Sequence, residues 1–292
     1  MKNDKKMIGA KKVSVVIPNY NYGRYFSKRI DTILNQTYSI YELVVLDDAS
    51  TDESVVIIEG KLAEVREKYP DLRIEFVVNQ KNSGKAVLQW KRGFEMTTGD
   101  YVWIAEADDL CSRRFLEEVM KGFDDPEVVL SYTESKLINT NGLTLAPNFR
   151  WSRDREKTGH YKESYIKDGF REIEEIMAVR CTIPNVSAVV FKKSEKIPHL
   201  QYFDEAAKFL QVGDWYFYAK VLEHGKISYN KKPLNKFRVH SESKTAGAKR
   251  DKRHYEEILV MHRMFTTRYN LDEFVTKRML NEEKRLVKRM EK

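Results

Sequence analysis

The chain has 292 residues, of which 41% are hydrophobic, and its 52 lysines and arginines exceed its 44 aspartates and glutamates, giving a formal net charge of +8. This composition excludes a disordered chain and a coiled coil, and it predicts one large domain with a substantial core. No apolar run approaches the roughly 18 residues that span a bilayer, which excludes a membrane-spanning helix.

Predicted strands and helices alternate over the first hundred residues. The strands are short apolar runs, and the segments between them carry apolar side chains at helical spacing. Because each crossover helix returns the chain to the same edge, this order predicts a doubly wound, parallel sheet of the α/β class. The predicted strands are residues 13–18, 43–46, 74–78 and the start of 99–110, and the predicted helices are residues 25–36, a segment after caps at 50–52 that runs to 68, and 85–96.

Polar side chains follow each of these strands, at residues 19–21, 47–48, 79–82 and 106–109. Ligands of parallel α/β sheets bind outside the carboxyl ends of the strands, so we expect the four groups to converge on one crevice. The alternative is that they are turn formers. That alternative explains any one group well but the four together poorly.

The fourth strand ends in an unusual concentration of charge, because Glu106, Asp108 and Asp109 lie within four residues. Carboxylates crowded at the end of a buried strand repel one another and lose hydration. We therefore expect a positive group among them, and a divalent cation is the natural candidate.

The middle of the chain is less regular. Asn141-Gly142 predicts a tight hairpin turn. Residues 147–161, which include Trp151, predict a long exposed loop that acts as a lid or a binding loop or is disordered. The remaining predicted elements are a helix at 115–123, strands at 128–132 and 186–191, a helix at 214–223 and short strands near Ile227 and Phe237.

Two helices are predicted from Lys249 onward, the second capped by Asn270 or Asp272. From Lys244 to Lys292 there are 14 basic and 8 acidic residues, so most of the net charge lies in this tail. Basic and acidic residues mixed at helical spacing are typical of a solvated face, and the alternative is a surface that meets anionic lipid or a phosphorylated acceptor. We predict a main domain at 1–245 and a basic helical extension at 246–292.

Two cysteines, Cys111 and Cys181, lie far apart in a sequence that shows no secretory signal. This pattern favours a reduced setting over a disulfide framework. The expected location is cytoplasmic, with peripheral contact at the inner face of the membrane as a further hypothesis.

Six short motifs occur in order along the chain. They are Val-Val-Ile-Pro-Asn-Tyr-Asn at 15–21, Asp-Asp-Ala-Ser-Thr-Asp at 47–52, Asn-Ser-Gly at 82–84, Gly-Asp-Tyr at 99–101 with Glu-Ala-Asp-Asp at 106–109, Gly-Asp-Trp at 213–215 and Phe-Arg-Val-His at 237–240. Over about residues 12–245 these motifs resemble those of glycosyltransferase family 2. The resemblance implies a GT-A fold, in which helices flank a mostly parallel, Rossmann-like sheet. It also implies a nucleotide-diphosphate sugar donor, a divalent cation (Mn²⁺ or Mg²⁺) and inversion at the anomeric carbon.

The resemblance places the metal-binding acid on Asp108 and brings His240 to the metal or the diphosphate. A cation held by carboxylates and substrate phosphates neutralises the charge that develops on the leaving group. Asp109 is adjacent and is expected to support Asp108. Glu106 stands where the family usually has Asp, which leaves a structural role open for it, and helix capping is the alternative for Asp108 and Asp109.

The nucleotide base needs hydrogen-bond partners in its plane, and the resemblance assigns the acceptor of its imide proton to Asp48. Tyr20 is expected against the base, unless it is ordinary packing, and Lys85 could equally be a solvated helix residue. The expected nucleotide-sugar site comprises Pro18, Tyr20, Asn21, Asp48, Asn82, Gly84, Lys85, Glu106, Asp109 and Arg238.

Inverting transfer needs one carboxylate to deprotonate the attacking hydroxyl, and we predict Asp214 as this general base. Helix capping is the alternative role. The family often has an acid just before this Asp, whereas Gly213 stands here. The pair Asp204-Glu205 competes for the role but is interpreted as a loop or the start of a helix. Acceptor contacts are hypothesised at Trp151, Asn185, Ser187 and Trp215.

The predicted function is metal-dependent, inverting transfer of a sugar from a nucleotide-diphosphate donor to a growing bacterial-type surface glycan or lipid-linked saccharide, with no nucleic-acid partner. One alternative is a nucleotidyltransferase acting on sugar phosphates, which usually has a Gly-rich basic loop where this chain has residues 18–21. The other is a non-catalytic basic module, which would bind polyanions in a salt-dependent way without metal-dependent nucleotide binding.

Overall fold

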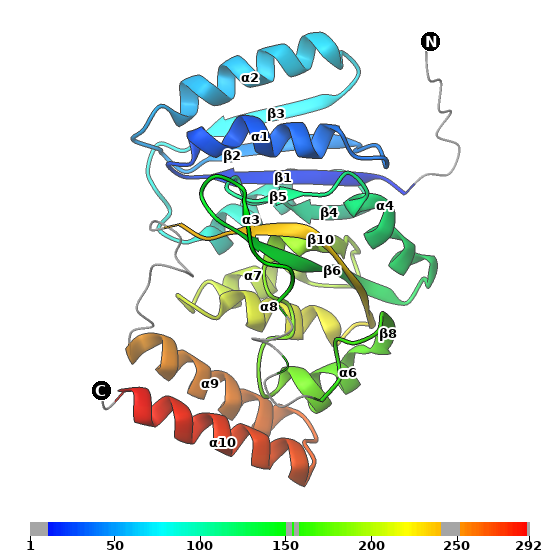
Figure 1. Cartoon of the computed structure of the whole chain (residues 1–292), viewed down its shortest axis with the longest axis vertical. Coiled ribbons are helices and arrows are strands. Elements are labelled where there is room, and N and C mark those ends of the chain that lie inside the picture. Colours follow the sequence, from blue (N-terminus) through cyan, green and yellow to red (C-terminus); the bar gives the residue numbers. More distant parts are fainter. Residues whose placement is uncertain (1–10, 150–153, 155–157, 241–251, 291–292) are drawn as a thin grey trace.

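The computed structural model describes residues 11–149, 154, 158–240 and 252–290. In these ranges ten strands form one mixed sheet that runs through the upper two thirds of Figure 1, in the order β3-β2-β1-β4-β9-β6-β10-β5, with β7 beside β6 and β8 beside β10. The strands are β1 Val13–Asn19, β2 Glu42–Asp47, β3 Arg73–Val78, β4 Tyr101–Ile104, β5 Leu110–Cys111, β6 Val128–Ile138, β7 Thr144–Ala146, β8 Tyr165–Asp168, β9 Val189–Lys192 and β10 Lys226–Arg238.

The first half of the sheet is parallel, as predicted. β2 pairs with β1 and β3, and β4 pairs with β1, all in the same direction. Beyond β4 the direction changes, because β9 is antiparallel to both β4 and β6. The fold is therefore α/β with a mixed sheet, and the carboxyl ends of β1 to β4 lie at one edge.

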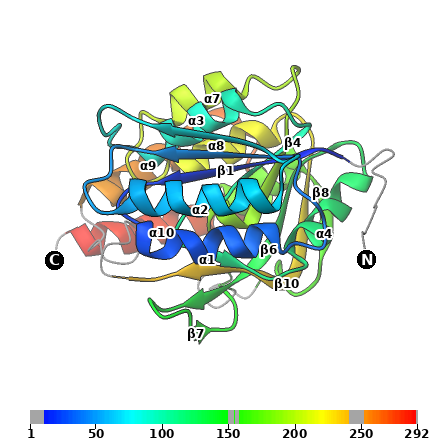
Figure 2. The ribbon, with the colours of Figure 1, turned by 90° about the horizontal axis from the view of Figure 1, so that it is seen from above.

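Helices cover both faces of the sheet, as the view in Figure 2 shows for α1 and α2 on one side and α3, α7 and α8 on the other. The helices are α1 Gly23–Leu34, α2 Ser54–Lys68, α3 Ala86–Met96, α4 Phe115–Met120, α6 Gly169–Glu172, α7 His199–Ala206, α8 Gly213–Leu222, α9 Lys252–Arg268 and α10 Glu273–Met290. Single turns of other helix types lie at η1 Lys121–Asp124, η2 Ile173–Met177 and η3 Val186–Ala188.

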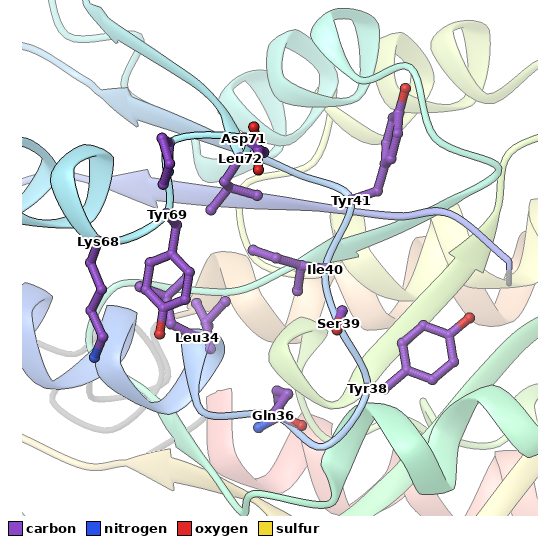
Figure 3. A pocket seen from close by; sticks show the side chains of 12 residues that line it. Leu34, Gln36, Tyr38, Ser39, Ile40, Tyr41, Lys68, Tyr69, Asp71 and Leu72 are labelled. Carbon is purple, nitrogen blue, oxygen red and sulfur yellow. The ribbon is translucent and has the colours of Figure 1, made fainter. Parts of the chain in front are cut away.

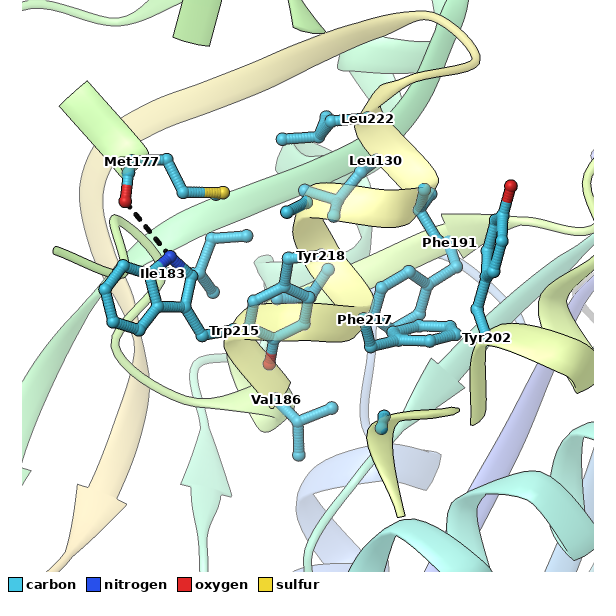
Figure 4. Packing of buried hydrophobic residues seen from close by; sticks show 14 of the residues in the cluster. Leu130, Met177, Ile183, Val186, Phe191, Tyr202, Trp215, Phe217, Tyr218 and Leu222 are labelled. Carbon is cyan, nitrogen blue, oxygen red and sulfur yellow. Dashed lines mark hydrogen bonds between the residues drawn. The ribbon is translucent and has the colours of Figure 1, made fainter. Parts of the chain in front are cut away.

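The alternation of side chains along β1 divides the core into two hydrophobic clusters. Val13, Val15 and Ile17 pack with α1 and α2, whereas Val16 packs with the cluster on the α3 side. That second cluster includes Phe191, Phe217 and other side chains drawn in Figure 4. Burying apolar surface on both faces is what holds this parallel half of the sheet together.

Three sequence predictions are corrected by the structure. Residues 186–188 form the helical turn η3, so the strand begins only at Val189. The two short strands near Ile227 and Phe237 are one strand, β10, whose pairing with β6 contains register shifts that bend it. Asp204 and Glu205 lie inside α7 and not in a loop or at a helix start.

The hairpin after β6 agrees with the sequence. Gly142 has a φ of +86°, a backbone conformation that is strained for residues with a side chain. Its N–H donates to the Asn139 carbonyl at 2.9 Å. β7 then returns antiparallel to β6.

The two C-terminal helices pack on the rest of the molecule below the sheet in Figure 1. Met261, Phe265 and Met279 belong to the same hydrophobic cluster as α8 and β9. Asp272 caps α10 by accepting from the Val275 N–H at 2.7 Å, as predicted. Among the described residues, no helix combines the length and the apolar character needed to cross a bilayer.

Candidate active site

The acidic residues after β4 lie on a tight turn that the sheet holds in place. The Ala105 N–H donates to the Val16 carbonyl at 2.8 Å, which extends the pairing of β4 with β1. The Asp109 N–H then donates to the Glu106 carbonyl at 3.2 Å and closes the turn. The three carboxylates, however, point to three different partners.

Asp108 pairs with His240, which the chain reaches just after β10. His240 Nε2 lies 3.1 Å from Asp108 Oδ2. The Asp108 side chain is 14% exposed, so this carboxylate borders solvent, whereas the His240 ring is buried. The structure thus brings together the two residues predicted to approach the metal.

Asp109 faces inward and holds the end of β10. Its Oδ1 accepts the Arg238 N–H at 2.8 Å, and the Ser187 hydroxyl also bonds to its carboxylate. Burial, together with the charge of Asp108, raises the pKa of Asp109. Asp109 therefore supports the turn, and its carboxylate is buried, so the expectation that it contacts the nucleotide sugar is not met in this conformation.

Arg238 is also a structural partner of the turn. Its Nε donates to the Asp108 carbonyl at 2.6 Å, and its Nη1 donates to the carbonyls of Asn139 and Thr140. The side chain is buried, and burial lowers its pKa. The expectation that Arg238 contacts the nucleotide sugar is not met in this conformation, because its donors are used within the protein.

Glu106 turns away from Asp108 toward helix α3. Its Oε1 accepts a hydrogen bond of 2.6 Å from Trp90 Nε1, and its backbone N–H donates to Ser187 Oγ at 3.1 Å. Burial and the Asp108 charge raise its pKa to about 8, although the Trp90 hydrogen bond acts in the opposite direction. Glu106 is thus held apart from the Asp108–His240 pair.

A buried arginine lies beneath the acidic turn, and the sequence reasoning missed it. Arg29 on α1 is fully buried, with its guanidinium 5.0 Å from the Trp103 ring. Within the described ranges its three nitrogen atoms have no hydrogen-bond partner, and its charge favours the ionised forms of Glu106 and Asp109. The sequence signal that could have identified it is the position of Arg29 on the apolar face of α1, among Phe26, Ile30 and Ile33.

Asp48, at the end of β2, holds the loop after β3. Its Oδ1 accepts from Asn79 Nδ2, Ser83 N and Gln89 Nε2 at 2.6 to 2.9 Å, and its Oδ2 accepts from Ser83 Oγ at 2.7 Å. Asn82 Nδ2 donates to the Asp48 carbonyl at 3.0 Å. The predicted base-binding acid and the predicted 82–85 loop are therefore adjacent.

The other predicted donor-site residues lie at the end of β1 or in the loops after β1 and β3. Tyr20 is 41% exposed, so its ring is accessible, while Pro18 is buried in β1. Asn21 Oδ1 accepts from the Thr51 N–H at 2.7 Å and fixes the turn before α2. Gly84 has a φ of +77°, and Lys85 Nζ bonds to the Ala207 carbonyl at the end of α7.

Asp214 lies in the first turn of α8 and is half-buried. The helix starts at Gly213, so Asp214 is not its N-cap. A Cβ on Gly213 would come within 2.7 Å of the Ala206 carbonyl and 3.4 Å of Val87. This close contact excludes the second acid that the family often has and sets the start of α8 against the start of α3. Asp204 and Glu205 are engaged elsewhere, with Lys91 and Tyr216 respectively.

Three of the four hypothesised acceptor residues are in the interior. Trp215 is 4% exposed and donates from Nε1 to the Met177 carbonyl at 3.0 Å, the dashed line in Figure 4. Asn185 is bonded to Ser135 and Asn235, and Ser187 bonds the acidic turn. These three side chains are buried and hydrogen-bonded within the protein, so they do not contact an acceptor. Trp151 lies outside the described residues.

A shallow cavity of about 400 Å³ lies at the opposite end of the strands, beyond the carboxyl-terminal ends of α1 and α2. Figure 3 shows Tyr38, Tyr41, Tyr69 and Lys68 around it. None of the predicted site residues lines this cavity. The acidic turn remains the candidate site, because it lies at the carboxyl ends of the parallel strands and carries two carboxyl groups with raised pKa values.

The residues present fit a divalent cation. A carboxylate and an imidazole are both metal ligands, and Mg²⁺ or Mn²⁺ is often held by one or two side chains with substrate phosphates completing the shell. Asp108 and His240 supply such a pair, and Arg238 and Asp109 hold the turn that carries it. Within the described ranges, no set of three or more His, Cys, Asp or Glu side chains forms a preassembled metal site.

The sequence model of the family described as Glycosyl transferase family 2 matches residues 14–174, more than half of the chain. The poly(ribitol-phosphate) β-N-acetylglucosaminyltransferase TarP of Staphylococcus aureus is 37% identical over 111 residues, which are 37% of this chain and 32% of TarP. The matched segments span between about a third and two fifths of the first curated relatives.

Two solved structures show the same fold. S. aureus TarS with UDP-GlcNAc superposes with a TM-score of 0.64 at 17% identity, over 94% of this chain and 72% of that chain. The mannosyltransferase PcManGT of Pyrobaculum calidifontis, with GDP-Man and Mn²⁺, superposes with a TM-score of 0.58 at 20% identity, over 95% and 70% of the two chains. The mixed sheet with flanking helices is thus a GT-A fold.

Proposed function

The chain belongs to glycosyltransferase family 2, and from this premise we propose that it transfers a sugar from a nucleotide-diphosphate donor to a hydroxyl group of an acceptor, with inversion. The observation that carries the proposal is the 3.1 Å contact of His240 with Asp108. It joins two motifs that are 132 residues apart at the carboxyl edge of the parallel strands, where ligands of such sheets bind.

Asp108 and His240 would hold the divalent cation, Mn²⁺ or Mg²⁺. When bound, the cation neutralises the negative charge that develops on the diphosphate leaving group. The chain's own contribution is orientation. Arg238 and Asp109 fix the backbone of the turn, so the Asp108 carboxylate is held in place before a ligand arrives.

The donor nucleotide would lie over the ends of β1 to β3. Asp48 Oδ2 can accept a further hydrogen bond, because it receives one from Ser83 Oγ and a carboxylate oxygen offers two lone pairs. Tyr20 offers an exposed ring for stacking on the base. Support comes from the nucleotide sugars present in the TarS and PcManGT structures.

Asp214 would act as the general base. Inverting transfer needs one carboxylate to remove the proton of the attacking hydroxyl. Asp214 is half-buried in the first turn of α8, and Gly213 before it packs close to Val87 in the first turn of α3. The competing pair, Asp204 and Glu205, is occupied with Lys91 and Tyr216.

The acceptor would be a growing surface glycan or a lipid-linked saccharide, approached through peripheral contact with the cytoplasmic face of a membrane. Helix α10 exposes Lys277, Lys284 and Lys288 at spacings that share one face. Two of its acids, Glu282 and Glu283, are paired with Arg180 and His262, whereas Glu273 is exposed in the first turn, four residues before Lys277. Phe274 is 65% exposed at the start of the helix.

A thermal-shift screen of UDP, GDP, dTDP and CMP sugars with Mn²⁺ or Mg²⁺ tests the donor and metal together, because a bound ligand raises the unfolding temperature by mass action. We expect one nucleotide class to stabilise the protein only when the metal is present. The variants Asp108→Asn and His240→Ala should abolish the metal-dependent part of the shift. No shift with any donor would contradict the proposal.

A further inference from the structure

The imidazole of His240 lies against two tyrosines from the start of α1. The Tyr22 ring meets it edge-on, with centroids 5.2 Å apart and planes at 85°, and the Tyr25 ring lies 5.4 Å away with planes at 42°. Tyr25 is buried and Tyr22 is half-buried. Two ring contacts of this kind restrict the rotation of the imidazole.

Tyr25 also contacts the arginine that holds the acidic turn. The Arg238 guanidinium lies 4.6 Å from the centre of the Tyr25 ring, within range of a cation–π interaction, and Arg238 Nε bonds to the Asp108 carbonyl. One aromatic ring therefore touches both residues that reach Asp108 from the end of β10. A shift of this ring would move the imidazole and the turn together.

The start of α1 is itself held firmly. The Gly23 N–H donates to Ser54 Oγ at 2.8 Å, and a Cβ on Gly23 would come within 2.7 Å of Ser54 Cα. The Tyr25 N–H donates to the Tyr22 carbonyl at 2.9 Å, which couples the two aromatic residues. The contacts of Gly23 with Ser54 therefore fix the position of the two tyrosines relative to α2.

We propose that Tyr22 and Tyr25 are positioning residues that hold His240 toward Asp108 and so set the affinity of this pair for a divalent cation. The inference rests on the proposed function, in which Asp108 and His240 bind the metal. The physical reason is entropic, since a ligand held in its binding orientation loses less rotational freedom when the metal arrives.

The test is a titration of the full chain with Mn²⁺ alone, with free Mn²⁺ measured by electron paramagnetic resonance. We expect Tyr25→Leu and Tyr22→Leu each to weaken Mn²⁺ binding by about tenfold, the lower end of the effect of losing a partner that orients a ligand. Tyr25→Phe keeps the ring and should stay within about twofold of the wild type. Tyr69→Leu, at the far end of α2, is the matched control and should bind normally.

A double-mutant cycle separates positioning from a general effect on folding. In a His240→Ala background, Tyr22→Leu should cause no further loss of Mn²⁺ affinity, because the Tyr22 ring acts through the imidazole. If His240→Ala weakens binding but both folded leucine variants bind like the wild type, the inference is wrong and the proposed metal ligand stands. If His240→Ala itself has no effect, the proposed ligand fails and the inference falls with it. Tyr22→Leu removes a less buried ring and keeps the test available if Tyr25→Leu does not fold.

Discussion

Trp90 Nε1 donates a hydrogen bond of 2.6 Å to Glu106 Oε1 across the space between α3 and the end of β4. This contact explains how the chain accommodates a glutamate where the family usually has an aspartate. The longer side chain is drawn toward α3, and Asp108 is left to pair with His240.

Replacing Trp90 with Phe should raise the pKa of Glu106 above its value of about 8, because the indole hydrogen bond stabilises the ionised carboxylate. Carbon-13 NMR of the glutamate carboxyl groups, titrated between pH 6 and 10, measures the change, and Glu106→Gln identifies the signal. An unchanged or lowered pKa in Trp90→Phe would show that the contact does not favour the charged form.

The raised pKa of Glu106 should also make the ligand-free protein less stable as the pH rises. Between its ordinary value of 4.5 and about 8, the native state keeps a proton that the unfolded chain has released. The native state then binds more protons, so this contribution to the free energy of unfolding is full below pH 4.5 and is lost progressively up to about pH 8.

The variant Glu106→Gln lacks this effect. Its unfolding temperature relative to the wild type should therefore increase from pH 5.5 to pH 8.5 by several degrees, at about 2 to 4 °C per kcal/mol for a chain of this size. Differential scanning calorimetry of both proteins measures the difference at each pH. A constant difference would mean that Glu106 titrates in the native state as it does in the unfolded chain.

Asp48→Ala should lower the free energy of unfolding by about 2 to 4 kcal/mol, because it leaves donors of Asn79, Ser83 and Gln89 without their acceptor. The matched control is Asp52→Ala, which removes one acceptor from the exposed start of α2 and should cost about 1 kcal/mol. Urea unfolding of both variants gives the comparison. Equal losses would argue against Asp48 as the support of the 79–83 loop.

Asp214→Asn should reduce the turnover number by about a hundredfold or more while donor affinity changes by less than about twofold, since a general base acts on the attacking hydroxyl and not on the donor. The control is Asp204→Asn, an acid on α7 that pairs with Lys91 and should leave turnover unchanged. Initial rates with the donor found by thermal shift measure turnover, and the melting temperature of each variant shows whether it is folded. Full activity in a folded Asp214→Asn protein would reassign the base.

The combined change of Lys277, Lys284 and Lys288 to Glu should release the protein from anionic vesicles, because each lysine near such a surface contributes about 1 kcal/mol. Co-sedimentation with vesicles of phosphatidylglycerol and phosphatidylcholine measures the bound fraction. Lys68, Lys196 and Lys208, changed to Glu together, form the control with equal charge change on other exposed surfaces. Equal losses in the two triple variants would point to net charge and not to this face of α10.

The sequence by itself determined the parallel half of the sheet and the placement of Asp48 and Asp108 at the carboxyl ends of β2 and β4. Runs of apolar residues report burial, and a polar residue that ends such a run marks the edge of the sheet. Both signals depend on residues that are neighbours in the chain. The turn at Gly142 was predictable for the same reason, because a local pair of residues indicates it.

Only the tertiary structure decided which side chains meet at that edge. His240 and Arg238 reach the acidic turn because β10 runs parallel to β6 and ends beside it, through register shifts that no local pattern encodes. Trp215 and Ser187 are buried because α8 and η3, which carry them, pack against other segments of the fold. Contacts between distant segments follow from how strands pair and layers pack, whereas periodicity reports only the environment of each segment.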